Sequence, residues 1–341
     1  MTRYENNTID SDDGRHLSCA KERPEPVESG HIKGSIRVKA APGEISNTAV
    51  WLYASDPASG AGAIAFGLSL DGKPVIVSLP AKGRLYYRII CNLPESFLGR
   101  DLDSLHLQCK DFLPGLLPMS GSGTLMAESD FAELAASVKR RVARFSIERI
   151  TNKIQTPGYD AGELKILGFH IENGVAFADM GWSTSSEPLT SNDFFNCSVI
   201  PPLRLKQSFS CAPAWSMASV VFSTPQTIAQ GSSRAFKSYY VYACPNHVKD
   251  DERWTLEKAG TSRTWTPRKT RLVIHCSSPS GDRFYAITMN SVEPGTWYKF
   301  KNINLKHAGS RDPDIPVEVS DGDFSLDMEE WTTSDGYIEN I

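Results

Sequence analysis

Apolar and polar positions alternate with a period of two through much of the first third of the chain. Ile36 and Val38 alternate with basic neighbours, which predicts a half-buried strand from residue 32 onward. Residues 50–53 form a more continuous apolar run. Further strands are predicted at residues 64–70, 74–79, 86–90 and 105–109, with a hairpin turn at Asp71-Gly72. Short strands separated by Gly, Pro and Asp predict a sandwich or barrel, not a parallel α/β sheet.

One segment has a helical period instead. Asp130 followed by Glu133 matches a capping box, and basic residues gather toward the other end of the segment, as suits a helix dipole. This predicts an amphipathic helix that packs on or bridges two β domains; a nucleic-acid-binding helix is the alternative. The apolar stripe of this helix comprises Phe131, Leu134, Ala135, Val138, Val142 and Phe145.

Strand signals resume after residue 158 and include a turn at Ser280-Gly281-Asp282. The predicted fold class is mainly β: two antiparallel β-sandwich or jelly-roll-like domains joined by one amphipathic helix. The predicted organisation is a flexible acidic arm (1–30), a barrel or jelly-roll-like domain (31–126), a helix and linker (127–157), a second sandwich (158–310) and an acidic tail (311–341).

Charge is unevenly distributed along the 341 residues. The net charge of −4 combines −9 in residues 311–341, −3 in residues 1–30 and +8 in the body between them. A basic body suits a partner that carries phosphates, although a solvated surface between flexible ends has the same pattern. The tail mixes acids with Phe324, Leu326, Met328 and Trp331, which is typical of a segment that docks on a protein partner or on the protein's own basic surface.

No motif predicts catalysis, a metal or a cofactor. Ser120-Gly-Ser-Gly123 lacks the spacing of a nucleophile elbow and is interpreted as a flexible turn. The seven cysteines are spread thinly without C-x-x-C spacing, which favours free buried thiols over disulfides or a zinc ribbon. His106, His170 and His275 are interpreted as sheet residues, and Asp321-Gly-Asp323 does not fit a calcium loop. A non-enzymatic protein is therefore expected.

The best binding signal is a basic loop around a tryptophan. Its cations could hold phosphates while the indole stacks on a base; the alternative is that the tryptophan packs on a sheet edge. Three basic residues of the first strand could extend the surface. The predicted nucleic-acid-binding residues are Arg263, Trp265, Arg268, Lys269 and Arg271, with Lys33, Arg37 and Lys39.

Residues 31–126 resemble the plant-virus cell-to-cell movement proteins, whose barrel derives from the viral jelly roll. The resemblance rests on Gly34 with its alternating strand, the apolar strand ending at Asp56, the gap Gly60-Ala-Gly-Ala63, and the basic-aromatic strand Arg84–Ile90. Residues 105–112 and 119–125 resemble the last segment. The family has a proline where Cys91 stands, and its members usually end in a variable tail where this chain has a second β half.

The resemblance implies that the protein binds single-stranded RNA, moves it between cells and self-associates, with Asp56 as a structurally required acidic group. Two alternatives stay open: a viral coat protein with jelly-roll domains, and a glycan- or protein-binding β-sandwich. No signal peptide or membrane span is expected. The protein is expected in the host cytoplasm, at cell junctions or in a virion, and it is not expected to be secreted.

Overall fold

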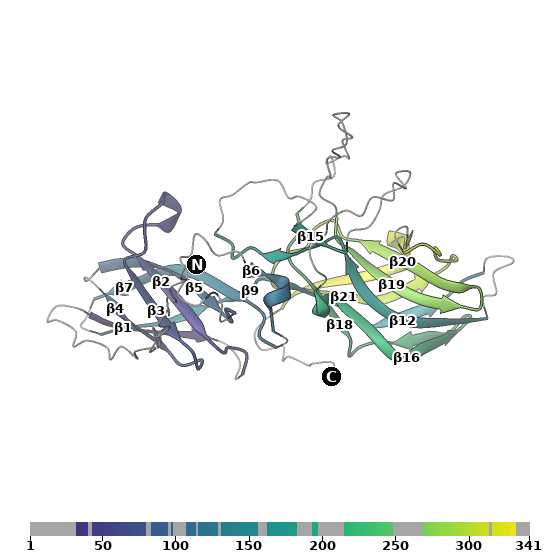
Figure 1. Ribbon diagram of the computed structural model, residues 1–341, viewed down its shortest axis with the longest axis horizontal. Helices are drawn as coiled ribbons and strands as arrows, with labels where there is room; N and C mark the ends of the chain where they lie inside the picture. Colours follow the sequence, from purple (N-terminus) through teal and green to yellow (C-terminus); the bar gives the residue numbers. More distant parts are fainter. Residues whose placement is uncertain are drawn as a thin grey trace, which may run out of the picture.

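The computed structural model describes residues 32–39, 43–79, 83–94, 97, 107–113, 115–128, 131–155, 162–182, 193–196, 215–247, 269–313 and 316–331. These residues form β-strands and short 3₁₀ turns in two lobes that lie side by side along the long axis (Figure 1). The prediction of a mainly β protein is confirmed. No described helix is long and apolar enough to cross a membrane.

The first lobe packs a three-stranded sheet against a five-stranded sheet. Ile36 and Val77 of the smaller sheet meet Val50 and Ile89 of the larger one in a buried apolar cluster. The smaller sheet has the order β4-β1-β8, formed by β1 (Ile32–Lys39), β4 (Val75–Leu79) and β8 (Phe131–Ser137). The larger has the order β3-β2-β5-β7-β9, formed by β2 (Thr48–Tyr53), β3 (Ala65–Ser69), β5 (Gly83–Cys91), β7 (Met119–Ala127) and β9 (Lys139–Arg140).

The second lobe contains two larger sheets around a second apolar cluster. One sheet is ordered β17-β11-β21-β10-β18, with β23 also paired to β21. It comprises β10 (Ala143–Ile147), β11 (Arg149–Asn152), β17 (Ser233–Ala235), β18 (Tyr240–Ala243), β21 (Thr296–Leu305) and β23 (Phe324–Glu330). The other is ordered β16-β12-β19-β20-β22. It comprises β12 (Glu163–Glu172), β16 (Ser219–Ala229), β19 (Arg271–Ser278), β20 (Gly281–Thr288) and β22 (Val317–Glu318).

A short ladder joins the lobes, because β6 (Leu107–Gln108) pairs with β14 (Phe177–Ala178). Within the second lobe, β13 (Gly174–Val175) pairs with β15 (Phe194–Phe195). The apolar cluster of the second lobe also takes in Trp51 and Tyr53 from the outer face of β2. This is why every residue of β2 is buried: its two faces belong to different cores.

The predicted helix is wrong. Its residues form β8, β9 and β10, and β8 pairs in parallel with β1 over seven positions. Ala132 and Ala136 are buried while Glu133 and Ala135 are exposed, so burial follows a strand period. Backbone pairing to β1 overrides the local helix preference of this alanine-rich segment. Asp130, the predicted cap, lies outside the described residues.

The sheets also differ from the prediction in their pairing. Three of the sheets are mixed, because β1–β8, β10–β21, β11–β21 and β20–β22 are parallel pairs, whereas the larger sheet of the first lobe is antiparallel throughout. Asp71-Gly72 does connect β3 and β4, but β4 pairs with β1, so the two strands belong to different sheets. By contrast, Gly281 begins β20 in a true antiparallel hairpin with β19.

The predicted flexible turn at residues 120–123 is also wrong. Ser120–Gly123 is not a turn but part of β7. A Cβ on Gly121 would lie 2.3 Å from the Ser137 carbonyl oxygen, and one on Gly123 would lie 2.7 Å from the Tyr87 hydroxyl. Glycine therefore permits close packing here, not flexibility.

The described part of the acidic tail fits the second of the two predicted alternatives, docking on the protein's own basic surface, while docking on a separate protein partner stays a prediction. β23 pairs antiparallel with β21 of the same chain. Its acids face lysines of the lobe: Lys299 pairs with Glu329, and Lys301 lies 3.4 Å from Asp327. The tail thus meets the protein's own basic surface. Exposed acids on an edge strand also discourage pairing with further strands.

Candidate functional site

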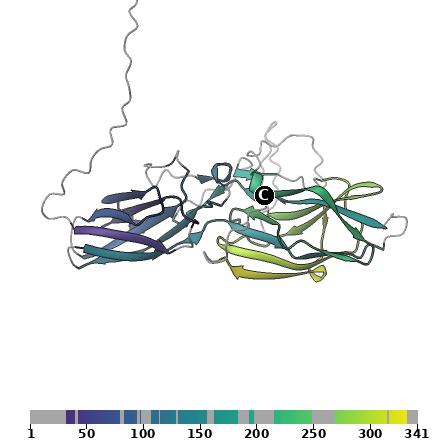
Figure 2. The ribbon, with the colours of Figure 1, turned by 90° about the horizontal axis from the view of Figure 1, so that it is seen from below.

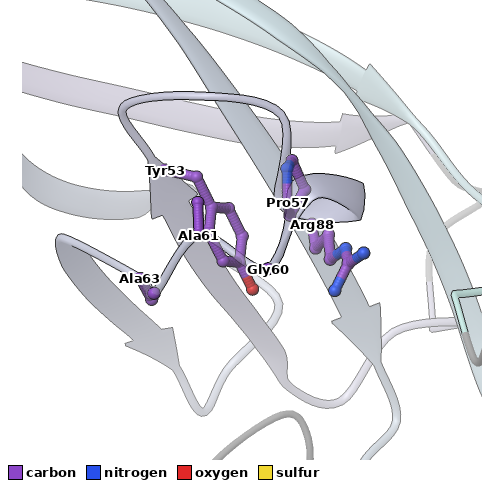
Figure 3. Close-up of a pocket in the computed structure, with 7 residues that line it drawn as sticks. Tyr53, Pro57, Gly60, Ala61, Ala63 and Arg88 are labelled. Carbon is purple, nitrogen blue, oxygen red and sulfur yellow. The ribbon is translucent and has the colours of Figure 1, made fainter.

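A hollow of about 250 Å³ opens in the first lobe, beside the end of β2 and the interior of β5. The Tyr53 side chain lies at its centre, with Ala61 and Ala63 on one side and Pro57 and Arg88 on the other (Figure 3). Gly60 and Gly62 complete the lining. The hollow is smaller than the roughly 300–1,000 Å³ of sites for drug-sized ligands, so it suits a group the size of one ring.

The loop over this hollow is held by local hydrogen bonds. The Asp56 carboxylate accepts from the Ala58 N–H at 2.9 Å and caps the 3₁₀ turn η1 (Pro57–Ser59). Gly60 then adopts a left-handed conformation with φ of 83°, and the Ile64 N–H donates to the Leu52 carbonyl at 2.7 Å. The loop leaves β2 and returns in a defined shape, so the hollow is built into the fold.

Arg88 is the only cation among the described residues that line the hollow. Its guanidinium carbon lies 5.6 Å from the centre of the Tyr53 ring and 5.4 Å from that of Trp182. Both contacts are within the range of cation–π attraction. Among the residues that the structure describes, no carboxylate forms an ion pair with Arg88. The half-buried guanidinium therefore lies against aromatic rings, and no acid among the described residues neutralises its charge.

The same sheet face continues the aromatic and polar character of the hollow. Trp51 is the register partner of Arg88, and its ring lies 5.2 Å from that of Phe66 on β3. On the other side of Arg88, β7 places Ser122 directly opposite, with an exposed side chain. Next to Arg88 the face thus carries the buried Trp51 ring on β2 and an exposed hydroxyl on β7.

The described members of the predicted nucleic-acid-binding set are divided between the two lobes. Lys33, Arg37 and Lys39 are exposed on β1 in the first lobe. Arg271 is on β19 in the second lobe, and it pairs with Glu318 at 3.1 Å. Lys269 donates to the Asn290 side chain at 3.2 Å. Arg263, Trp265 and Arg268 lie outside the described residues.

Other residues considered in the sequence make contacts that stabilise a turn or a sheet. Asp56 is exposed and caps a turn, and its predicted role as a required acidic group stays a prediction. His275 stacks on Phe284 and lies 3.4 Å from Asp282, while His170 lies 3.6 Å from Glu172. Within the described part of the chain, no three His, Cys, Asp or Glu side chains gather around a point that could hold a metal ion.

Sequence reasoning missed Arg88, Tyr53 and Trp182 as a group. Two signals for them were nonetheless visible: the small-residue gap Gly60–Ala63 and the basic-aromatic strand Arg84–Ile90. The structure brings these two motifs together at the hollow. Trp182 comes from a distant part of the chain, and no local pattern indicates its position beside Arg88.

No protein-family profile and no curated protein sequence matches the chain. Solved structures match over most of its length. A proposed cell adhesion protein of Parabacteroides distasonis has a TM-score of 0.57 at 13% identity, over 90% of this chain and 98% of that chain. Another from Bacteroides eggerthii has a TM-score of 0.54 at 14% identity, over 88% and 95%. A fimbrilin of Porphyromonas gingivalis has a TM-score of 0.50 at 11% identity, over 88% and 98%.

These matches overturn the viral interpretation. The fold is that of bacterial adhesion and fimbrial proteins along both lobes, whereas the movement-protein resemblance covered only residues 31–126. Short alternating strands recur in unrelated β folds, which explains the false resemblance. The prediction of a viral movement or coat protein is therefore wrong. Its single-stranded RNA partner and its location in host cytoplasm, cell junctions or a virion are wrong with it.

Proposed function

We propose that this protein is a non-enzymatic subunit of a bacterial cell-surface structure that mediates adhesion. The observation that carries the proposal is the match of both lobes to adhesion and fimbrial proteins over nearly the full length of each partner. It favours the sequence-based alternative of a glycan- or protein-binding β-sandwich over the viral ones.

Two β-sandwich domains are part of this proposal. The first would extend through β9 and the second would begin at β10, so the chain would pass between them at Arg141 and Val142. The supporting observation is that β9 pairs with β7 of the first lobe, whereas β10 pairs with β21 of the second. The boundary then lies later than the predicted end of the first domain at residue 126.

Self-association is supported by exposed apolar side chains at one edge of the first lobe. β3 is the edge strand of its sheet, and large apolar residues on and around it face solvent. Apolar side chains that gather on a surface mark contact sites in soluble proteins. They are Ile64, Phe66 and Leu68, 37–43% exposed, with Leu70 and Ile76, 64% and 63% exposed.

Surface labelling tests the location. Antibodies against the purified chain should label intact cells of the organism that makes it, seen as immunogold particles along the cell surface. Labelling that appears only after the cells are permeabilised would overturn the proposal.

Analytical ultracentrifugation tests the assembly. The purified chain should form concentration-dependent oligomers, and Leu70→Asp should weaken them because it places a charge in the apolar contact. Val221→Asp is the matched control, because Val221 is 83% exposed on β16 in the other lobe. Equal effects of both variants would contradict the assignment of this edge as the contact.

A further inference from the structure

We propose that the hollow beside Tyr53 and Arg88 binds a carboxylate-bearing sugar residue. This inference rests on the proposed adhesive function for its biological meaning, but the binding itself is tested separately on the purified protein. It assigns a ligand class to a site that no comparison describes.

The first argument is the state of the Arg88 charge. A guanidinium offers a planar fork of N–H donors that matches a carboxylate in two parallel hydrogen bonds. Rings at 5.6 Å and 5.4 Å fix the position of the guanidinium but leave its charge uncompensated by an acid of the described chain. A ligand carboxylate would supply that compensation without first displacing an internal ion pair. A donor held in place before binding loses less entropy when the ligand arrives.

The second argument is the surface around the guanidinium. Sugar rings present apolar C–H faces and many hydroxyl groups. The half-exposed indole of Trp182 suits the C–H faces, while the exposed Ser122 hydroxyl and the backbone of Gly62 and Ala63 suit the hydroxyls. A hollow of about 250 Å³ accepts one ring with its substituents.

The charge count argues against a nucleic acid in the same place. Polynucleotide binding depends on several cations that follow successive phosphates. Among the described residues that line the hollow, Arg88 alone is a cation, and the next cation on its strand, Arg84, lies over a different ring at 5.3 Å, that of Tyr86. One guanidinium matches one carboxylate.

Calorimetric titration of the purified full chain tests the proposal. The probes are N-acetylneuraminic acid and glucuronic acid, with glucose as the neutral counterpart of the latter. We expect an acidic sugar to bind about tenfold or more tightly than glucose, and R88Q to lose that preference. R88K should recover only part of it, since lysine keeps the charge but lacks the fork.

R84Q is the matched control, because Arg84 is an exposed arginine on the same strand that also lies over a tyrosine ring. It should leave the affinity for acidic sugars within about twofold of wild type. Thermal unfolding of each variant establishes that the variants are folded.

Three results would overturn the proposal: equal affinity for glucuronic acid and glucose, no effect of R88Q in a folded protein, or tighter binding of a short peptide with a free terminal carboxylate at the same residues. Surface labelling and self-association are independent readouts. Failure of sugar binding with surface labelling intact would reject this ligand alone, whereas loss of surface labelling would reject the adhesive function.

Discussion

The junction of the lobes contains a buried ion pair between Glu44 and Arg140. Glu44 and Arg140 lie 2.5 Å apart with side chains only 8% and 5% exposed. Arg140 also donates to the Trp331 carbonyl and lies 4.4 Å from the centre of its ring. A second buried arginine follows nearby in the chain: the guanidinium of Arg144 lies over the rings of Trp331 and Trp297. Residues near the start, middle and end of the chain therefore depend on one charge pair.

Glu44→Gln should lower the free energy of unfolding by about 3–5 kcal/mol, because it leaves Arg140 buried without its counter-charge. Urea denaturation measures the change. Lys139→Gln is the control: Lys139 pairs with Glu330 at 3.3 Å, but both side chains are mostly exposed, so the change should stay below about 1 kcal/mol. A loss below about 1 kcal/mol for Glu44→Gln would show that water reaches the pair.

The free thiols predicted from the sequence are confirmed at Cys91, Cys109, Cys244 and Cys276, which are all buried and unbridged. Burial raises the pKa of the Cys91 thiol from 9.0 to about 12, slightly opposed by its hydrogen bond with Thr48. Burial also raises the pKa of Cys244 and Cys276 well above 9.0. Such thiols stay protonated and inert in the folded state at neutral pH.

These shifts set the pH dependence of stability. Above pH 9.0 an unfolded chain loses thiol protons that the folded chain keeps, so the unfolded state is favoured as pH rises from 9.0 toward about 12. We expect full thiol-dependent stability below pH 9.0 and a progressive loss above it, measured by urea denaturation at each pH. Cys91→Ala should make the decline shallower. An unchanged decline in that variant would assign the alkaline loss to other groups.

At the scale of elements, the alternation of apolar residues predicted the strands well where one face of a strand is exposed, as in β1 and β4. It failed where parallel pairing with a distant strand decides the structure, as in β8, whose alanines fit a helix equally well. The alternation also could not predict that β4 pairs with β1 and not with β3, because the sequence of a strand does not determine which strand it pairs with. The loop and the strand that line the hollow were visible in the sequence, whereas the contact of Trp182 with Arg88 depends on tertiary packing.

Strand β7 owes its packing to glycine. Gly121→Ala should destabilise the protein by about 1–3 kcal/mol, because the new methyl group would meet the Ser137 backbone, which cannot move as a side chain can. Gly322→Ala, with no atom within 4 Å of the new carbon, should stay within about 0.5 kcal/mol of wild type. Thermal unfolding compares the two, and similar melting temperatures would contradict the close approach.

At the scale of the molecule, the two lobes share apolar surface. Trp51 and Tyr53 of β2 belong to the same buried cluster as Phe145 and Phe300 of the second lobe, and β6 pairs with β14 across the junction. Lobes joined only by a polar linker move and unfold independently, whereas a continuous core couples them.

Calorimetry should therefore show a single cooperative unfolding transition, with calorimetric and van't Hoff enthalpies in agreement. Two separated transitions would show that the shared surface does not couple the lobes. Glu44→Gln should shift the whole transition to lower temperature without splitting it, since its partner lies at the junction.

The position of β1 determines how the first lobe would respond to mechanical load. β1 is bonded on both sides, antiparallel to β4 and parallel to β8. A force along the strand would act on both ladders in shear, so many backbone bonds would have to break together instead of opening one after another. Paired on both of its edges, β1 should therefore resist such a force more strongly than a strand that is bonded on one edge alone.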